Sequence, residues 1–200
     1  MIPALWLVVA YLIGGIPFGY LIVRFTTGRD VRSMGSGNIG ATNVLRTTGR
    51  AVAVLTLLLD IGKGFLAVWL MAQATYNSPL WMSAAALAVM AGHAYPVFLR
   101  FQGGRAVASF VGAFLYLTPI PLLSVIGLFV IVVAVTRYIS LGSIMAAGTF
   151  PFAVWLILHP PWVEVAAAII AGVFIVVRHG ANIQRLRAGN EHVFSFARRR

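Results

Sequence analysis

The sequence predicts an all-α fold: a polytopic integral membrane protein with seven transmembrane helices, its N-terminus outside and its C-terminus in the cytoplasm. Of the 200 residues, 60% are hydrophobic and only 10% are charged, whereas soluble domains carry about 25% charged residues. Several apolar runs reach the ~20 residues that a helix needs to cross a hydrocarbon core of ~30 Å. These runs are uninterrupted, whereas strands of a membrane barrel alternate polar and apolar residues, so helices are the expected spanning elements.

The first span is expected to bend near its middle. It contains Gly14, Gly15, Pro17 and Gly19, and membrane helices use such residues for close packing or for a kink. No basic segment precedes this apolar run, so it does not resemble a cleaved signal peptide and should remain in the mature protein. Five spans follow directly from the apolar runs: residues 4–23, 51–74, 80–98, 139–158 and 162–177.

Residues 106–136 form either one kinked helix or two short ones, because Pro119 and Pro121 fall near the middle. The arginines decide between these alternatives. They cluster after the first span, after the third, after residue 136 and after the last, and basic residues mark cytoplasmic loops. Two crossings put every arginine on one side, which gives seven spans. The fourth helix is then short, about 20 Å at 1.5 Å per residue, as is typical of a wedge beside a cavity.

Residues 1–200 are expected to form a single transmembrane domain, since no internal repeat or linker interrupts them. The net charge of +11 indicates cytoplasmic loops and contact with anionic lipid rather than with nucleic acid. The absence of cysteine excludes disulfides, thiolate nucleophiles and cysteine-ligated metals. No carboxylate or histidine cluster suggests another metal, so we expect neither metal nor cofactor. Most polar residues fall in three connections predicted to face the cytoplasm: residues 24–50, 99–105 and 178–200.

Residues 35–43, GSGNIGATN, form a glycine loop between two apolar runs. No strand precedes it, so it is not a Rossmann fingerprint, and Ala41 stands where a P-loop requires lysine. Glycines nevertheless let successive backbone N–H groups form a concavity that binds anions. The loop has no acidic residue, and arginines follow it. The predicted phosphate-binding residues here are Ser36, Gly37, Asn38, Thr42, Asn43 and Arg46.

A second candidate segment lies where the third span ends and the short helix begins. Gly103 and Gly104 could supply backbone N–H groups, and Arg105 a bidentate fork, to a phosphate. The simpler alternative is a tight cytoplasmic turn with one snorkelling arginine.

The third candidate segment, residues 178–191, follows the last span. His179, Asn182 and Arg185 are spaced at i, i+3 and i+6 and can project from one helical face. The alternative is a juxtamembrane tail attracted to anionic lipid. That alternative is our interpretation of Arg187 and of Arg198–Arg200.

Two opposite charges, Asp60 and Lys63, lie three residues apart within the second span. Charges inside the membrane are costly, so they pair with one another or face a cavity. A structural ion pair on one helical turn is one interpretation, and a lysine near a substrate cavity is the other.

These segments together resemble the bacterial integral membrane acyl-phosphate:glycerol-3-phosphate acyltransferases, and the resemblance runs over the whole chain. It is carried by GSGNIGATNVLR at 35–46, DIGKG at 60–64, GHAYPVFLRFQGGRAVAS at 92–109 and RHGANIQRLRAGNE at 178–191. The family usually has lysine and threonine where this chain has Arg105 and Ser109. Arginine keeps the charge but is not interchangeable with lysine at a phosphate.

The resemblance implies a seven-helix fold with an active site open to the cytoplasm, in the bacterial inner membrane. Such enzymes transfer a fatty acyl group from acyl phosphate to glycerol 3-phosphate, forming 1-acyl-glycerol 3-phosphate (lysophosphatidic acid) and phosphate, without a cofactor. This reaction begins phospholipid synthesis. The implied partners are the two substrates, membrane lipid and a soluble enzyme that forms acyl phosphate.

The resemblance also implies roles for single residues. The implied catalytic residues are Ser36, His179 and Asn182, and Arg105 would help to hold the glycerol phosphate. The proton of the attacking hydroxyl goes either to His179 as a general base or to a phosphate oxygen of the donor. We favour the donor phosphate, with His179 binding and orienting, because an acyl phosphate is already activated and mainly needs positioning.

Two other functions are considered. A membrane transporter for a phosphorylated small solute is the main alternative, since broken helices and charges at mid-membrane suit that class. Against it, the predicted donors cluster on one face of the membrane, and no inverted repeat is present. A structural scaffold with lipid-binding arginines would show no turnover and would tolerate Asn43→Ala.

Overall fold

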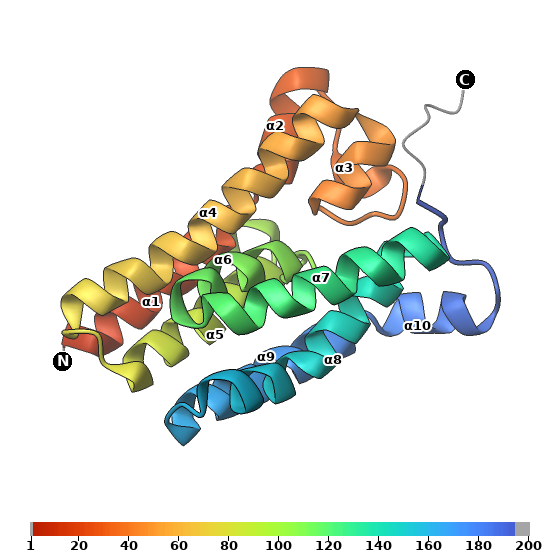
Figure 1. Ribbon diagram of the computed structural model, residues 1–200. Helices are drawn as coiled ribbons and strands as arrows, with labels where there is room; N and C mark the ends of the chain where they lie inside the picture. Colours follow the sequence, from red (N-terminus) through yellow and green to blue (C-terminus); the bar gives the residue numbers. More distant parts are fainter. Residues whose placement is uncertain (1, 195–200) are drawn as a thin grey trace. The chain divides into compact units, whose positions relative to one another are not determined.

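A computed structural model of the chain describes residues 2–194, which form helices joined by short turns (Figure 1). The expectation of an all-α polytopic protein is confirmed for these residues. A bent pair of helices, α9 (Trp162–Arg178) and α10 (Gly180–Arg187), meets at 57° and gives a sixth candidate span. Seven crossings and their orientation stay predictions. Five helical segments are long and apolar enough to cross a membrane: Pro3–Thr27, Arg50–Ala74, Pro79–Leu99, Pro119–Thr136 and Ile139–Leu158.

The chain divides into two compact units, residues 1–117 and residues 118–200, and the single transmembrane domain stays a prediction. In the first unit, α1 packs on α4 and α5, and α6 packs on α4 and α5. The helices of this unit are α1 (Ile2–Gly15), α2 (Phe18–Thr27), α3 (Ala41–Thr47), α4 (Arg50–Ala74), α5 (Pro79–Ala94) and α6 (Val107–Leu117), with the 3₁₀ turns η1 (Val31–Ser33) and η2 (Val97–Leu99).

Glycines let the helices of the first unit approach backbone to backbone. Gly92 of α5 lies against the carbonyl oxygen of Tyr11 in α1, and Gly64 of α4 lies against that of Ser109 in α6. A Cβ at either position would overlap the facing carbonyl. Small residues are the usual means of close packing in lipid, where no hydrophobic force drives helices together.

The predicted bend in the first span lies at Ile16 and Pro17, between α1 and α2, where Pro17 has φ −92° and ψ 72°. The carbonyl oxygen of Ile16 accepts a hydrogen bond from Lys63 Nζ at 2.9 Å. Lys63 also pairs with Asp60, one turn earlier in α4, at 2.7 Å. Of the two interpretations of these charges, the buried ion pair is the arrangement observed.

Residues 106–136 form two helices, as the arginine distribution predicts. α6 ends at Leu117, Thr118 leaves the helical conformation with φ −142° and ψ 67°, and α7 (Pro119–Thr136) begins with a proline. Proline suits this first position because its missing N–H would have no partner there. With 11 residues, α6 is about 16 Å long at 1.5 Å per residue, too short for a full crossing unless the bilayer becomes thinner around it.

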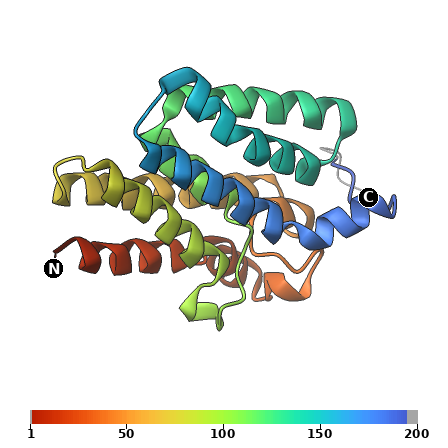
Figure 2. The same ribbon diagram turned by 90° about the horizontal axis from the view of Figure 1, so that it is seen from below.

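The second unit contains α7, α8 (Ile139–Leu158), α9 and α10, with α8 packed between α7 and α9 (Figures 1 and 2). Gly172 of α9 lies against the carbonyl oxygen of Ala147 in α8, so this pair also uses a glycine for close contact. Pro151 lies inside α8, which membrane helices tolerate because neighbouring groups satisfy the freed carbonyl.

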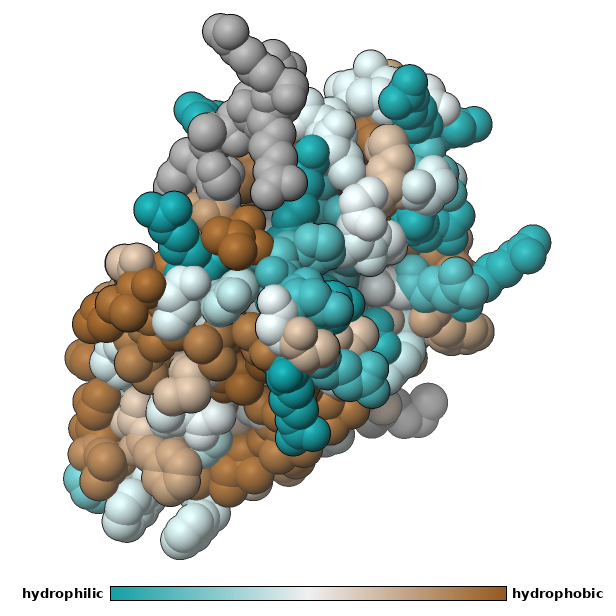
Figure 3. Space-filling view, turned by 90° about the vertical axis from the view of Figure 1, so that its right-hand side faces the viewer, coloured by the Kyte–Doolittle hydropathy of each residue, from teal (hydrophilic) through white to brown (hydrophobic). Residues whose placement is uncertain are grey.

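Large apolar side chains lie on the outside of the helices, as expected for a surface that faces lipid. Hydrophobic residues cover much of the face drawn in Figure 3. A soluble protein rarely exposes contiguous apolar patches of this kind. Examples from both units are Leu5, Leu58, Val135, Phe152 and Val177.

Candidate active site

The glycine loop is held in shape by one buried side chain, Asn43, of which only 1% is exposed. Its nitrogen donates to the carbonyl oxygens of Val31 at 3.2 Å, Met34 at 3.0 Å and Asn38 at 2.8 Å. Its oxygen accepts from the backbone N–H of Ser36 at 2.8 Å. An amide side chain has two N–H donors and one carbonyl, so its donors and its acceptor are engaged inside the loop.

Two glycines give the loop its path around Ser36. Gly35 and Gly37 have φ of +57° and +71°, a region that residues with a side chain rarely adopt. The N–H of Gly37 donates to the carbonyl of Met34, just ahead of the loop, at 3.0 Å, and that of Gly40 donates to Asn38 Oδ1 at 2.8 Å. These N–H groups therefore shape the loop, and the predicted anion site draws mainly on side chains.

A small apolar core lies under the glycine loop and ties it to the surrounding helices. Its members come from α2, η1, the loop itself, α3, α4 and η2, so the loop stands on several rigid elements, which is what precise positioning of a site requires. These buried residues are Val23, Val31, Ile39, Val44, Ala53 and Leu99.

The second predicted segment is a tight turn after α5. The N–H of Gly103 donates to the carbonyl of Ala94 at 3.2 Å, and that of Gly104 to the carbonyl of His93 at 3.0 Å. The imidazole of His93 lies so close to Gly104 that a Cβ there would overlap it. Both N–H groups thus close the turn, and Arg105 carries its positive charge.

The backbone of this turn adopts a conformation that is rare for residues with a side chain. Arg100, Phe101 and Ala106 have φ of 52°, 62° and 62°. Each such residue costs on the order of 1–3 kcal/mol, and such residues persist where the surroundings over-determine them, often at functional sites.

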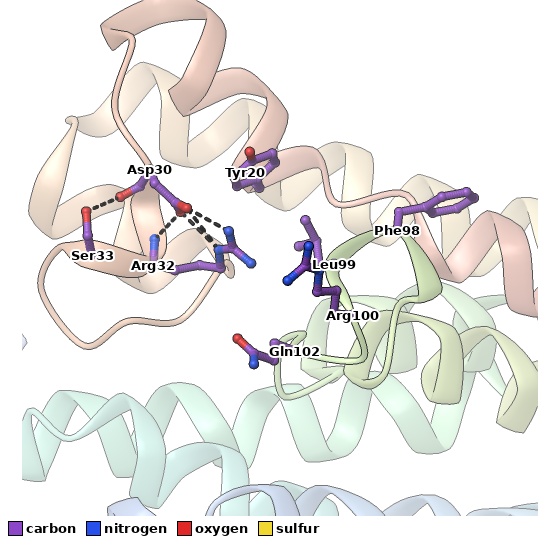
Figure 4. A pocket seen from close by; sticks show the side chains of 8 residues that line it. All are labelled: Tyr20, Asp30, Arg32, Ser33, Phe98, Leu99, Arg100 and Gln102. Atoms are coloured by element: carbon purple, nitrogen blue, oxygen red, sulfur yellow. Dashed lines mark hydrogen bonds and ion pairs between the residues drawn. The ribbon is translucent and has the colours of Figure 1, made fainter.

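A cavity of about 600 Å³ lies between this turn and the segment ahead of the glycine loop. Figure 4 shows Asp30 and Arg32 on one side, and Arg100 with Gln102 on the other. Arg32 and Asp30 form an ion pair at 2.7 Å. The hydrogen bond from Arg32 lowers the pKa of the Asp30 carboxyl from its ordinary value. The lining residues are Tyr20, Asp30, Arg32, Ser33, Phe98, Leu99, Arg100 and Gln102.

In the third predicted segment, His179 lies at the bend between α9 and α10. Its Nδ1 is 2.8 Å from the carbonyl oxygen of Ile175. A carbonyl oxygen only accepts, so Nδ1 carries a proton, and in the neutral ring Nε2 is the basic nitrogen. The two helices meet at 57°, and the carbonyl oxygen of His179 accepts the N–H groups of Asn182 at 2.8 Å and Ile183 at 2.9 Å. His179 therefore begins the helix that carries Asn182, and the shared face stays a prediction.

Asn182 and Arg185 both bind the carboxylate of Glu191. Asn182 Nδ2 donates to Oε1 and Arg185 Nε to Oε2, each at 2.9 Å. Because a carboxylate only accepts, this fixes the orientation of the amide. Asn182 Oδ1 is then a buried acceptor with no hydrogen-bond partner among residues 2–194. Burial opposes ionisation of Glu191, but the hydrogen bonds and charge of Asn182 and Arg185 outweigh it and lower its pKa.

Sequence analysis did not single out Asp30, Arg32 or Glu191. The signal was present, because the chain has only four acidic residues, and each could have been searched for a basic partner. Arg198–Arg200, interpreted as lipid-binding, lie outside the described residues. Within residues 2–194 no group of histidine and acidic side chains could hold a metal ion.

The comparisons with known proteins point to one family. A family model described as glycerol-3-phosphate acyltransferase matches residues 4–189. A glycerol-3-phosphate acyltransferase of Geobacter sulfurreducens is 45% identical over 186 residues, which cover 93% of this chain and 94% of the relative. Glycerol-3-phosphate acyltransferase 2 of Moorella thermoacetica is 47% identical over 186 residues, with 93% and 94% covered.

Two crystal structures of PlsY, an integral membrane glycerol 3-phosphate acyltransferase, are also similar. The glycerol 3-phosphate form matches with a TM-score of 0.90 and 35% identity, covering 96% of each chain. The lysophosphatidic acid form matches with a TM-score of 0.88 and 33% identity, covering 98% of this chain and 97% of the other.

Proposed function

We propose that the three polar segments of this chain each bind substrate, on the premise that the chain belongs to the glycerol-3-phosphate acyltransferase family of integral membrane proteins. Proteins of this family transfer a fatty acyl group from acyl phosphate to glycerol 3-phosphate and form lysophosphatidic acid. The transporter and scaffold alternatives give way to this chemistry.

The phosphate groups are assigned to the glycine loop and the turn after α5. Arg46 is exposed on α3 and Arg105 is half-buried at its turn, and guanidinium forks match phosphate oxygens bidentately. Asn43, Gly103 and Gly104 act by supporting these two segments, since their own polar groups are engaged there. Gly37, whose N–H donates to the carbonyl of Met34, is likewise proposed to support the loop. The residues proposed to line the phosphates are Ser36, Asn38, Thr42, Arg46 and Arg105.

The glycerol hydroxyl that is not acylated is assigned to Asn182, so that the attacking hydroxyl keeps its single proton for the leaving phosphate. The observation that carries this proposal is the buried Oδ1 atom, for which residues 2–194 offer no donor. A buried acceptor without a partner costs free energy, and a substrate hydroxyl supplies the missing donor. Glu191 holds the amide so that its oxygen, and not its nitrogen, is presented.

The reaction then needs positioning more than activation. The hydroxyl oxygen attacks the acyl carbon, the bond from that carbon to the phosphate oxygen breaks, and phosphate leaves with the hydroxyl proton. We favour direct transfer of this proton to a donor phosphate oxygen, with His179 orienting the hydroxyl. The protonated Nδ1 of His179 leaves a basic Nε2, which is also the atom that a general base would use.

The activity is tested with purified protein in detergent, palmitoyl phosphate and labelled glycerol 3-phosphate, without coenzyme A. Lysophosphatidic acid is the expected product, and its absence would refute the acyl phosphate as donor. Asn182→Ala should raise KM for glycerol 3-phosphate on the order of tenfold, the equivalent of one hydrogen bond to substrate. The control is Asn190→Ala, an exposed asparagine near the end of the same segment; an unchanged KM in Asn182→Ala would remove the assignment.

The role of His179 is separated by kinetics. If His179 orients substrate, His179→Ala raises KM and lowers kcat together. If that variant has no turnover while both substrates still bind with their original affinity, the histidine is the base and substrate assistance is wrong.

The proposed topology has seven crossings of a bacterial inner membrane. The N-terminus lies outside, and the polar segments face the cytoplasm. This topology rests on the arginine distribution and on the separate α6 and α7. Because the chain has no cysteine, a single introduced thiol reports one position. Tyr76→Cys should react with an impermeant maleimide outside intact cells, and Arg29→Cys only after lysis; the reverse pattern would refute the orientation.

A soluble enzyme that forms acyl phosphate is the proposed supplier of the donor substrate. Its product is an anion with a lipid tail, which suits transfer at the membrane surface to the basic connections of this chain.

A further inference from the structure

Three buried titratable residues of the first unit have no part in the mechanism above. Asp60, Lys63 and His93 have exposed fractions of 2%, 4% and 3%. Lys63 Nζ is 2.7 Å from Asp60 Oδ1, and His93 Nδ1 is 3.6 Å from the same oxygen. The Asp60 carboxylate thus lies between a cation on its own helix and an imidazole on α5.

At one side, this cluster reaches the break in the first span. Lys63 Nζ donates to the carbonyl oxygen of Ile16 at 2.9 Å, where the chain passes from α1 to α2. A backbone carbonyl freed by a break needs a partner inside the membrane. The helix after the break, α2, contributes Val23 to the apolar core under the glycine loop, so the lysine helps to set where that loop begins.

At the other side, the cluster reaches the turn that carries Arg105. The carbonyl of His93 accepts the N–H of Gly104 at 3.0 Å. The side chain of His93 also touches the same glycine, because a Cβ on Gly104 would overlap Nε2. One nitrogen of the ring therefore faces Asp60 and the other faces the turn.

We propose that Asp60, Lys63 and His93 form a positioning network that holds the glycine loop and the Arg105 turn in register with each other. The inference rests on the proposed function, in which both segments bind substrate phosphate. Positioning matters because a displacement of 1 Å at a catalytic constellation can lower kcat/KM by about 10²-fold. None of the three side chains is a catalytic residue. Lys63 and His93 act through the backbone that they contact, and Asp60 acts through these two side chains.

A purely structural role is the rival explanation, and energetics argue against it. Replacing a buried ion pair by well-packed apolar residues is often neutral or stabilising, whereas removing one partner leaves an uncompensated charge. Stability alone therefore does not require these charges at a helix contact. The contact of Lys63 with the break in the first span and that of His93 with the Arg105 turn favour a role in positioning these two segments.

The test removes both charges together and reads kinetics. Asp60→Asn/Lys63→Met is neutral and leaves no buried charge unpaired. It is assayed for kcat and KM with palmitoyl phosphate and glycerol 3-phosphate, in the natural background and with Arg105→Gln. The matched control is Val68→Ala, a buried apolar truncation on the same helix, which lowers the melting temperature without touching the network.

The expected result is a well-folded double variant whose kcat/KM falls by ten- to about 10²-fold, while Val68→Ala keeps its KM. In the Arg105→Gln background the double variant should cause little further loss, because neighbouring sites that act through one group are not additive. Lys63→Arg with Asp60 intact should recover part of the activity.

Two results would overturn the network: an unchanged kcat/KM in the double variant, or a loss of kcat/KM in the Arg105→Gln background that is as large as in the natural background. If Arg105→Gln itself leaves kcat/KM unchanged, the proposed binding of substrate phosphate by Arg105 is wrong. Should the double variant not fold, His93→Gln is carried through the same cycle and judged by the same criteria.

Discussion

Replacing Asn43 with alanine tests whether this buried side chain holds the glycine loop, the proposed phosphate-binding segment, in its conformation. The variant removes the contacts of the amide nitrogen with three backbone carbonyl oxygens. It also removes the acceptor of the Ser36 N–H. The two N–H donors of the amide make at most two full hydrogen bonds, and its oxygen accepts one here, which gives three. At about 1 kcal/mol each, the native loop conformation loses about 3 kcal/mol relative to disordered alternatives.

The loss of loop stability converts to a loss of kcat/KM if, as proposed, Ser36 and Arg46 bind substrate, because only the ordered loop holds these side chains in place. With 1.36 kcal/mol per tenfold, kcat/KM should fall on the order of 10²-fold. The helices should remain, since the contacts of Asn43 lie within residues 31–43. The assay is steady-state formation of lysophosphatidic acid, with circular dichroism and melting temperature measured on the same samples.

Asn43→Asp is the diagnostic companion of this variant. It keeps an acceptor for Ser36 but replaces the donors by a charge that faces carbonyl oxygens, so it should be at least as impaired as Asn43→Ala. The control is Thr26→Ala, which loses an exposed hydrogen bond on α2. If Asn43→Ala retains most of its kcat/KM, the loop does not depend on this amide and the reasoning fails.

Two further predictions concern the supporting residues. The folded-state pKa of Glu191 lies below its unfolded value of 4.5, so the stability that its ionised form contributes is present above that pH and is lost as pH falls through the folded pKa. Between about pH 7 and about pH 3, the melting temperature of Glu191→Gln should therefore fall less than that of the natural protein. An equal fall of the melting temperature in both proteins would contradict this. Gly37→Ala forces a side chain into φ +71° at a cost of about 1–2 kcal/mol, so kcat/KM should fall by roughly five- to thirtyfold, whereas Gly62→Ala, whose Cβ meets open space, should be neutral.

Much of the architecture could be predicted because lipid imposes strong rules. Apolar length located the spans to within a few residues, and Ile139–Leu158 coincides with its prediction. The arginine distribution divided residues 106–136 correctly into two helices. These signals are summed over many residues, so single exceptions do not obscure them.

The interior of the site could not be predicted in the same way. The sequence marks Asn43, Gly103 and Gly104 as polar or flexible, but not that their hydrogen-bonding groups are engaged within their own segments. Nor does it show that Glu191 fixes the amide of Asn182. Such pairings depend on where a chain returns in space, and residue spacing alone did not reveal the bend between α9 and α10.

The burial of Lys63 has a chemical consequence for an enzyme whose donor is itself an acylating agent. An accessible lysine amine is a nucleophile that an acyl phosphate could modify without catalysis, whereas a guanidinium stays protonated and unreactive. Of the 15 lysine and arginine residues, 14 are arginines. The single lysine is buried in an ion pair. The folded enzyme therefore offers its reactive substrate no side-chain amine to attack, and is protected from accumulating amide-linked fatty acid on itself during turnover.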